Sequence, residues 1–352
     1  MKKTFSVRYF LSLLCFLLSG AVLYNPLYEA TKPIIVSIGS VLVGLLLCLF
    51  YSSFFHKYRE KTEQITVTAR ILSGIALAAL CTSCVFFLSE MRAAFGNFSQ
   101  FYGDKTLGIA FLVLMLFVCA YASGRKSEGI FRFCQLVCPM FVFYYFMMFF
   151  SLFQTGSLVL PEKETFFGSS QSTVVKTFLS GIYLFSDIAV FCFVFEDKKH
   201  KDIKKPLLKE KLGASFVFSV VLLLTRIRTS FMFGETLTAN LRFCDLASIK
   251  LMPHFSFPEL FLLFMVFACI IKVSVYVRAA SKLLGIIIKK DKKFSLDTYV
   301  SAFFVLFFSL SLERFLYNST YKNVFFTLSL LASSILLVLI TLFSLKRQNK
   351  TL

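Results

Sequence analysis

Long apolar runs alternate with short polar and charged segments along the whole chain. Ten of these runs are near the ~20 residues that a helix needs to cross the hydrocarbon core of a bilayer. The pattern therefore predicts an all-α polytopic membrane protein with about ten transmembrane helices. The predicted spans are residues 5–28, 33–55, 68–90, 106–123, 130–153, 173–195, 212–230, 258–284, 296–317 and 322–345.

The composition agrees with this interpretation. Hydrophobic residues make up 57% of the 352 residues and charged residues 16%, whereas a soluble domain carries about 25% charged residues. The N-terminus, MKKTFSVRYFLSLLCFLLSG, also has the basic start and apolar stretch of a signal peptide. Because its apolar run continues past the small residues and nine further spans follow, we expect a retained first helix.

The positive charge gives an orientation. The formal net charge is +19, but the lysines and arginines concentrate between apolar runs, which favours contact with the lipid bilayer over nucleic acid binding. With both termini inside, the inner segments hold about twice as many basic residues as the outer ones, which predicts an N-in, C-in topology. Arg226 and Arg228 are assigned to the outer segments, whereas the run at 196–211 faces the inside.

Ten spans divide into five and five. If the second five repeat the first, an odd number makes them enter from the opposite side, which is the inverted-repeat plan of many secondary transporters. This gives a first repeat at 1–153, a second at 173–345 and a cytoplasmic tail at 346–352. The outer segment 231–257 has apolar positions at near-helical spacing, which predict a short surface helix: Leu237, Leu241, Leu246 and Ile249.

A carboxylate lies in the middle of the sixth span, at Asp187. A charge at mid-bilayer costs roughly 2.5–3.5 kcal/mol on insertion scales, so it indicates a functional site. Small residues that permit unwinding accompany it in the lead helix of each repeat. These are Ser19, Gly20 and Ala21, before Asn25-Pro26, in the first span, and Gly181 and Ser186 in the sixth.

The eighth span carries the other deeply placed charge, Lys272, about fifteen residues from its start. Arg278 and Lys282, further along, are close enough to the end to snorkel to the interface. We hypothesise that Lys272 is a fixed cation in the place that a coupling sodium ion takes in related transporters. Asp187 then either meets the cationic part of a ligand or pairs with Lys272, and the sequence leaves both open.

Enzyme, metal and cofactor signals are missing from the sequence. There is no HExxH, GxSxG or P-loop motif, and the three histidines fall in predicted loops. The CxxC at Cys81 and Cys84 and the CxxxC at Cys134 and Cys138 lie inside predicted spans, without a nearby histidine. We therefore expect packing cysteines, no enzyme, and no metal or cofactor site.

Several motifs have a specific spacing. The stretch AYASGRKSEGIFRFCQLVCP places Ala120, Tyr121, Glu128, Ile130, Arg132 and Pro139, and KVSVYVRAA follows a K-x-S-x-Y-x-x-A pattern through Lys272, Ser274, Tyr276 and Ala279. The first helix carries Gly20, Leu23, Tyr24 and Pro26, and the sixth carries Phe185-Ser186-Asp187. In these motifs the chain resembles the B subunits of spore germinant receptors, the spore permeases of the amino acid–polyamine–organocation superfamily.

The chain departs from that family at two of these places. The glutamine usual in the family's first helix is replaced, at Tyr9, and the sixth-helix motif of aromatic, glycine and glutamate reads Phe185-Ser186-Asp187 here. The outer segment GETLTANLRFCDLASIKL resembles the family's lateral helix without its usual proline. The likeness nevertheless extends over nearly the whole chain.

The resemblance implies a ten-helix core of the leucine-transporter type. It implies a subunit in the inner membrane of a spore, or a bacterial cell membrane, that works with a membrane-anchored A subunit and a lipoprotein C subunit. A small germinant, often an amino acid, would bind between the first and sixth helices, at Ser19, Gly20, Ala21, Phe185, Ser186 and Asp187. The alternatives are a genuine amino acid permease with Lys272 replacing sodium, and a membrane scaffold in which Asp187 only bonds a neighbouring helix.

Overall fold

A computed structural model describes most of the chain as long helices. The helices are α1 (Lys2–Leu23), α2 (Ile34–Tyr58), α3 (Val67–Phe98), α4 (Lys105–Gly124), α5 (Ser127–Gln154), α7 (Gln171–Phe195), α8 (Pro206–Asn240), α10 (Pro258–Ile288) and α12 (Lys322–Leu345). The structure also describes the helical stretch Thr298–Phe308 and the single residues Thr66, Asp245, Ala247 and Ile249. All these residues except Thr66 are helical, and the predicted tail at 346–352 lies outside them.

The expectation of an all-helical chain with membrane-type helices is confirmed for the described residues. Five helices are long and apolar enough to cross a membrane: Ser37–Phe55, Val67–Phe95, Gly129–Phe150, Leu208–Phe233 and Glu259–Ile288. Shorter apolar helical stretches fall on the other predicted spans: Val7–Leu23, Val113–Gly124, Leu184–Phe195, Thr298–Phe308 and Leu328–Ser344. Each predicted apolar run therefore corresponds to a helix.

The seventh predicted span, 212–230, is too short at both ends. The helix begins at Pro206, a residue suited to the first helical position because its ring fixes φ and no amide proton is needed there. It continues through Asn240, so Leu237 belongs to α8 rather than to a separate surface helix. Ile249 is helical and buried, while Leu241 and Leu246 lie outside the described residues.

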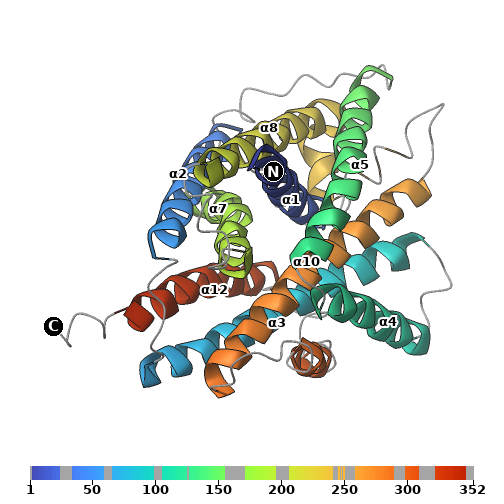
Figure 1. Cartoon of the computed structure of the whole chain (residues 1–352). Helices are drawn as coiled ribbons and strands as arrows, with labels where there is room; N and C mark the ends of the chain where they lie inside the picture. Colours follow the sequence, from blue (N-terminus) through green and yellow to red (C-terminus); the bar gives the residue numbers. More distant parts are fainter. Residues whose placement is uncertain are drawn as a thin grey trace.

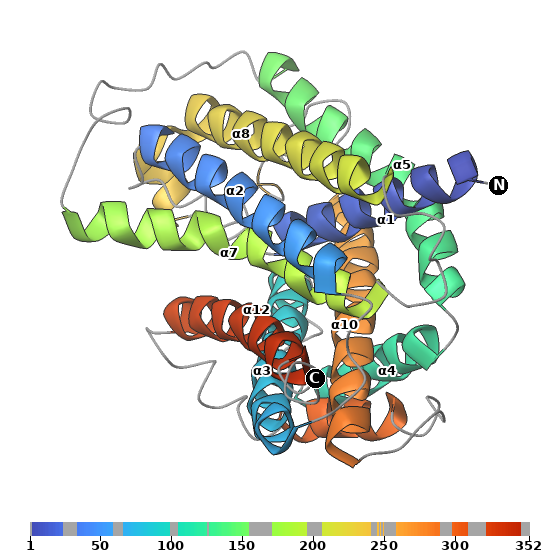
Figure 2. The same cartoon turned by 60° about the vertical axis from the view of Figure 1, so that its left-hand side comes forward.

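The first helix lies inside the bundle. Figure 1 shows α1 surrounded by α8, α5, α7 and α10, and it packs against all four. In Figure 2, α3, α4 and α12 form a second group beside this one, with α10 running past both groups. The contacts of α10 with α3, α4 and α1 join the two groups.

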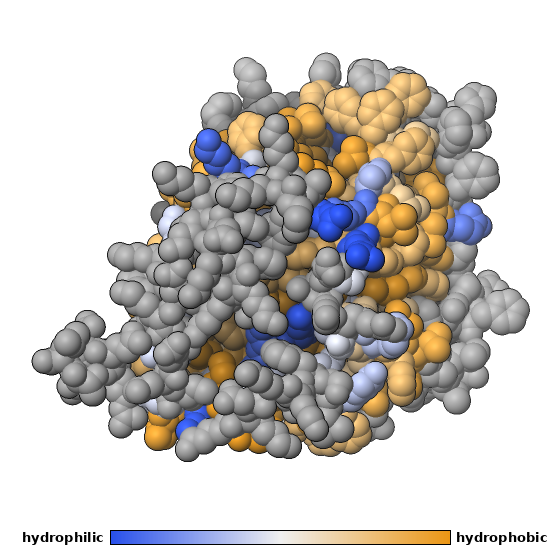
Figure 3. Space-filling view, viewed as in Figure 1, coloured by the Kyte–Doolittle hydropathy of each residue, from blue (hydrophilic) through white to orange (hydrophobic). Residues whose placement is uncertain are grey.

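The outer surface of the helices is largely apolar. Leu46, Phe117 and Phe146 are 63%, 67% and 65% exposed, and on the face in Figure 3 apolar residues cover much of the area coloured by hydropathy. A water-soluble protein rarely presents so many contiguous large apolar side chains. The surface therefore fits a surrounding of lipid, in agreement with a multi-pass membrane protein.

Many buried serine and threonine hydroxyl groups are satisfied within their own helices. Ser73 donates to the Ala69 carbonyl at 2.7 Å, and Ser219 donates to the Ser215 carbonyl at 2.8 Å. Such bonds to the carbonyl one turn earlier remove the need for water in an apolar interior. Serine and threonine are therefore compatible with the buried helix faces of this chain.

Candidate functional site

The two deeply placed charges of the sequence meet. The Lys272 ammonium on α10 donates a hydrogen bond to Oδ2 of Asp187 on α7, forming an ion pair. Lys272 is 0% exposed and Asp187 1% exposed. Of the two possibilities left open by the sequence, a direct Asp187–Lys272 pair is the one that the structure contains.

A second donor reaches the same carboxylate. The Tyr276 hydroxyl donates to Oδ1 of Asp187, so each carboxylate oxygen has its own partner from α10. Lys272 and Tyr276 are four positions apart on a helix, and residues at that spacing lie on one face. This geometry gives a physical reason for the lysine–tyrosine spacing in the K-x-S-x-Y-x-x-A pattern.

The backbone of α1 passes close to the pair at Gly20. A Cβ atom built on Gly20 would lie 2.8 Å from the Lys272 Nζ, 2.9 Å from its Cε and 3.5 Å from the Asp187 Oδ2. These separations are too short for an added methyl group unless the lysine moves. Glycine at this position therefore makes room for the lysine head group, and α1 completes the site.

Aromatic rings enclose the ammonium group. Lys272 Nζ lies 3.8 Å from the centroid of Phe16 and 5.8 Å from that of Phe87. Tyr276 stacks on Phe16 with centroids 6.5 Å apart and meets Phe87 edge-on at 5.7 Å. The ring faces attract the cation and exclude water, so the charge is stabilised by the rings as well as by Asp187.

Phe16 and Phe87 are site residues that were not predicted from the sequence. Phe16 is four positions before Gly20 and therefore on the same face of α1. That spacing was a usable signal, but the first helix is rich in phenylalanine and leucine. Phe87 gives no comparable signal, because only the packing of α3 on α10 brings it to the site.

The expected helix breaks are not present in the described residues, and that prediction is wrong there. The α1 helix is continuous from Lys2 to Leu23, and α7 from Gln171 to Phe195. Ser19 donates to the Cys15 carbonyl at 2.6 Å as part of an intact turn. Because side chains of α10 already satisfy Asp187, no backbone group has to be released for it. Asn25 and Pro26 lie outside the described residues.

The remaining predicted site residues are buried beside the pair or turned away from it. Ser19, Ala21 and Ser186 are 0%, 2% and 1% exposed. Phe185 packs elsewhere, with its ring edge-on to Phe218 of α8 at 5.4 Å and in the space that a side chain on Gly44 of α2 would occupy. Phe185 therefore joins α7 to α2 and α8 rather than contacting the charges.

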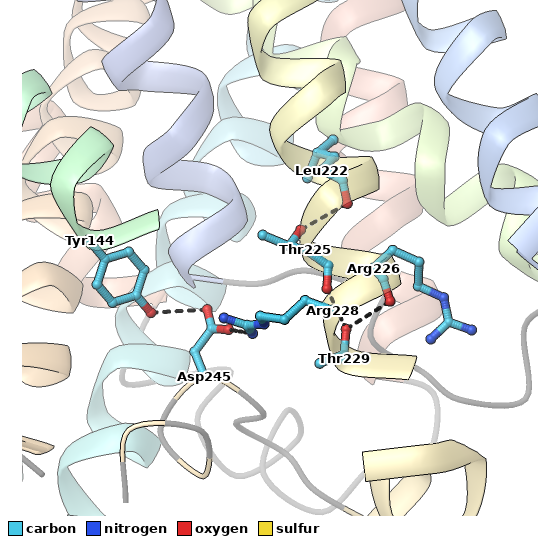
Figure 4. A network of polar contacts seen from close by, with 7 residues as sticks. All are labelled: Tyr144, Leu222, Thr225, Arg226, Arg228, Thr229 and Asp245. Carbon is cyan, nitrogen blue, oxygen red and sulfur yellow. Dashed lines mark hydrogen bonds and ion pairs between the residues drawn. The ribbon is translucent and has the colours of Figure 1, made fainter. Parts of the chain in front are cut away.

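A second buried ion pair lies at the far part of α8. Arg228 donates to Oδ1 of Asp245, and the Tyr144 hydroxyl of α5 donates to Oδ2 at 3.0 Å (Figure 4). Arg226 and Arg228, which the sequence counted with the outer segments, are 1% and 0% exposed. Both are buried side chains of α8. The sequence signal for this buried pair was the presence of two arginines in an otherwise apolar stretch.

Two basic residues of α10 bind the ends of other helices. Lys282 donates to the carbonyls of Phe193 at 3.1 Å and Val194 at 2.6 Å, in the last turn of α7. Arg278 donates to the Ser123 carbonyl at 3.2 Å, next to the end of α4. The carbonyls of a last helical turn have no partners within the helix, and cations there are favourable. These side chains therefore cap helix ends, and their snorkelling to the interface stays a prediction.

The described cysteines are packing residues. Nine of the ten are free and buried, and they include all four in the CxxC and CxxxC pairs. In the part of the chain that the structure describes, no group of three histidine, cysteine or acidic side chains could hold a metal ion.

Comparison with known proteins gives no assignment. No family model matches the chain, and no curated protein matches it. The resemblance to spore germinant receptor B subunits therefore rests on the motif residues themselves. Chemically, the site offers one carboxylate and one ammonium in a dry, aromatic surrounding, which are the complements of the two charged groups of a zwitterion.

Proposed function

We propose that this chain is the transporter-like membrane subunit of a spore nutrient germinant receptor. It binds a small germinant, an amino acid in this proposal, between α1 and α7, and signals to partner subunits. The observation that carries the proposal is a convergence in space. Gly20, Asp187 and the Lys272–Tyr276 pair come from three separate motifs of the resemblance, and they meet at one point.

The helix packing supports the inverted-repeat plan that belongs to this proposal. In such a plan each helix of the first repeat has a counterpart five spans later. The first three predicted spans, α1, α2 and α3, each contact their counterparts α7, α8 and α10. With the excess of basic residues in the segments assigned to the inside, the proposed topology is ten spans with both termini inside.

The ion pair supports a ligand-responsive role. Burying two charges is expensive, and each depends on the other for compensation. A zwitterionic ligand brings an ammonium that competes for Asp187 and a carboxylate that competes for Lys272. Binding then shifts the protein between paired and ligand-bound states by as much as the ligand's affinities for the two states differ.

The proposed assembly follows the resemblance. The partners are a membrane-anchored A subunit and a lipoprotein C subunit, and the location is the inner membrane of a spore. Signalling requires that the change at Asp187 reach a surface of the chain. The contacts of α10 with α3, α4, α7 and α1 give a direct physical route away from the site.

A second candidate function is a genuine amino acid permease. It is favoured by one observation, the position of the Lys272 ammonium between α1 and α7, against Gly20 and Asp187. A fixed cation there would replace a coupling sodium ion. The receptor and the permease share a binding site and differ in whether the ligand crosses the membrane.

The test is a thermal-stability screen of the purified full-length protein with amino acids, nucleosides and sugars. A ligand that binds the native state stabilises it by about 2.7 kcal/mol at one hundred times its Kd. We expect at least one amino acid to raise the Tm of the wild type but not of Asp187→Asn. Tyr51→Phe is the matched control, because Tyr51 bonds Ser334 away from the site, and it must respond like the wild type.

Two results would count against the proposal. A folded wild type that responds to no amino acid contradicts the proposed ligand class. An equal response of Asp187→Asn contradicts the site. Uptake of a stabilising amino acid into proteoliposomes then separates the two candidates, since a receptor gives no accumulation and a permease does.

A further inference from the structure

The carboxylate of Asp245 connects two helices that are distant in the sequence. Oδ1 accepts from Arg228 of α8, and Oδ2 accepts from Tyr144 of α5 at 3.0 Å. Asp245 is 4% exposed, and both donors are 0% exposed. Figure 4 shows the carboxylate between the two side chains, with one donor arriving from each helix. Asp245 therefore links α5 to α8 through one polar bond to each helix.

The two helices that Asp245 connects both pack against α1, the helix that carries Gly20. The α1 helix packs against both α5 and α8, and α5 also packs against α8 (Figure 1). The helices α5 and α8 therefore form one continuous wall beside α1. Separation of α5 from α8 would therefore uncover α1 along the side where the two helices meet.

The next residue of α5 binds α1 directly. The Tyr145 hydroxyl donates to the Leu18 carbonyl at 3.4 Å, two positions before Gly20. The rings of Tyr144 and Tyr145 are edge-on to each other with centroids 5.3 Å apart, and Tyr144 also packs on Phe264 at 4.6 Å. The same turn of α5 thus holds Asp245 with one tyrosine and the turn of α1 next to the ion-pair site with the other.

We propose that Asp245 fastens α5 to α8 so that the two helices cover α1, an arrangement called the clamp below. Loss of the Asp245 bonds then gives water and solutes access to the turn at Ser19 and Gly20. The clamp is built to have two states. A buried arginine is held in place while its counter-charge is present, and losing that counter-charge makes its burial more costly. Breaking the Asp245 bonds therefore favours an arrangement in which Arg228 reaches water.

This inference rests on the proposed function in one respect, that the turn of α1 at Gly20 belongs to the binding site. Its test needs no ligand. Failure of the clamp and failure of the ligand proposal are therefore separate results, obtained from different measurements.

The experiment measures access to α1 in the purified full-length protein. Ser19→Cys is the reporter, because cysteine is close in size to serine and Ser19 is 0% exposed. The rate of labelling by a water-soluble methanethiosulfonate is followed by peptide mass mapping, which separates this position from the native cysteines. Labelling at a buried position proceeds through the open population, so its rate reports on opening.

We expect Asp245→Asn to speed labelling at Ser19→Cys by about tenfold, as loss of a bond between charged groups implies. Tyr144→Phe keeps the ion pair and removes one bond to the same carboxylate, so it is also expected to speed labelling, by no more than Asp245→Asn does. The exchanged pair Arg228→Asp with Asp245→Arg restores opposite charges, and its labelling rate returns toward that of the wild type.

Ser281→Cys is the matched control for general loosening. Ser281 is 2% exposed and lies near the end of α10 where Lys282 caps α7. The proposal requires that labelling there stay unchanged in the clamp variants. It is overturned if Ser19→Cys and Ser281→Cys speed up together, or if neither Asp245→Asn nor Tyr144→Phe changes the rate at Ser19→Cys. Should Asp245→Asn fail to fold, the milder Tyr144→Phe decides the outcome.

Discussion

Gly20 and Lys272 share one space at the centre of the bundle. A Cβ atom on Gly20 would lie 2.8 Å from the lysine Nζ, so the missing side chain of one residue is filled by the head group of the other. The lysine cannot simply move aside, because its ammonium is bonded to Asp187 and lies against the Phe16 ring. The glycine, the lysine and the carboxylate therefore depend on one another.

Replacing Gly20 by alanine is expected to lower the free energy of unfolding by about 1–3 kcal/mol, the usual cost of adding a methyl group to a filled interior. Thermal unfolding of the purified protein measures it. Gly39→Ala is the control, since a Cβ there meets nothing within 4 Å. We expect it to be neutral or stabilising by less than about 1 kcal/mol, from helix propensity. Equal effects of the two substitutions would contradict the close approach at Gly20.

Removing one charge of the central pair is expected to be far more harmful than removing both. Asp187→Asn or Lys272→Met alone leaves a buried charge without its partner, at a cost of about 3–5 kcal/mol. The double variant removes both charges, while the introduced amide would keep an acceptor for Tyr276, so we expect it to recover most of that loss. A double-mutant cycle in thermal unfolding measures the coupling, and simple additivity of the two losses would argue against the pair.

The hydroxyl of Tyr276 is expected to stabilise the protein more than an ordinary buried hydroxyl does. Tyr276→Phe keeps the ring packing on Phe16 and Phe87 and removes a bond to a carboxylate, which costs about 1.5–3 kcal/mol. The control is Tyr51→Phe, which removes a neutral bond to Ser334, for about 0.5–1.5 kcal/mol. Chemical or thermal unfolding ranks the two, and the reverse ranking would contradict the role of Tyr276.

Lys282→Met is expected to loosen the end of α7 without unfolding the bundle. The change removes the donor for the Phe193 and Val194 carbonyls, and a cation at a helix C-terminus contributes about 0.3–1 kcal/mol, up to about 2. Hydrogen exchange in the last turn of α7 is therefore expected to speed up by about thirtyfold at most. Lys209→Met, at an exposed position of α8, is the control and leaves that turn unchanged.

The positions of the helices could be predicted well from the sequence, because helix formation here depends mainly on the local run of apolar residues. A run of apolar residues near membrane length forms a helix whatever its neighbours are, since an unpaired backbone in lipid is too costly. The ends were less predictable, because polar residues continue a helix without adding to hydropathy. The extensions of α8 to Pro206 and Asn240 and of α3 to Phe98 are examples.

The candidate site was predictable only in part. Asp187 and Lys272 each stood out as a charge in an apolar span, but 85 positions separate them, and no local pattern says that two such charges meet. The pairing of Arg228 with Asp245 could not be predicted for the same reason. The prediction of unwound backbone at Gly20 failed because small residues allow either a break or close packing, and the lysine head group fills the space beside this glycine.

The pairing of Asp187 with Lys272 also has an electrical consequence. A positive and a negative charge held together move through the membrane field as a neutral unit, whereas a single charge exchanges about 2.3 kcal/mol per 100 mV of membrane potential. A rearrangement that carries α7 and α10 together therefore transfers no net charge from this pair. The pair itself therefore adds no voltage dependence to such a rearrangement.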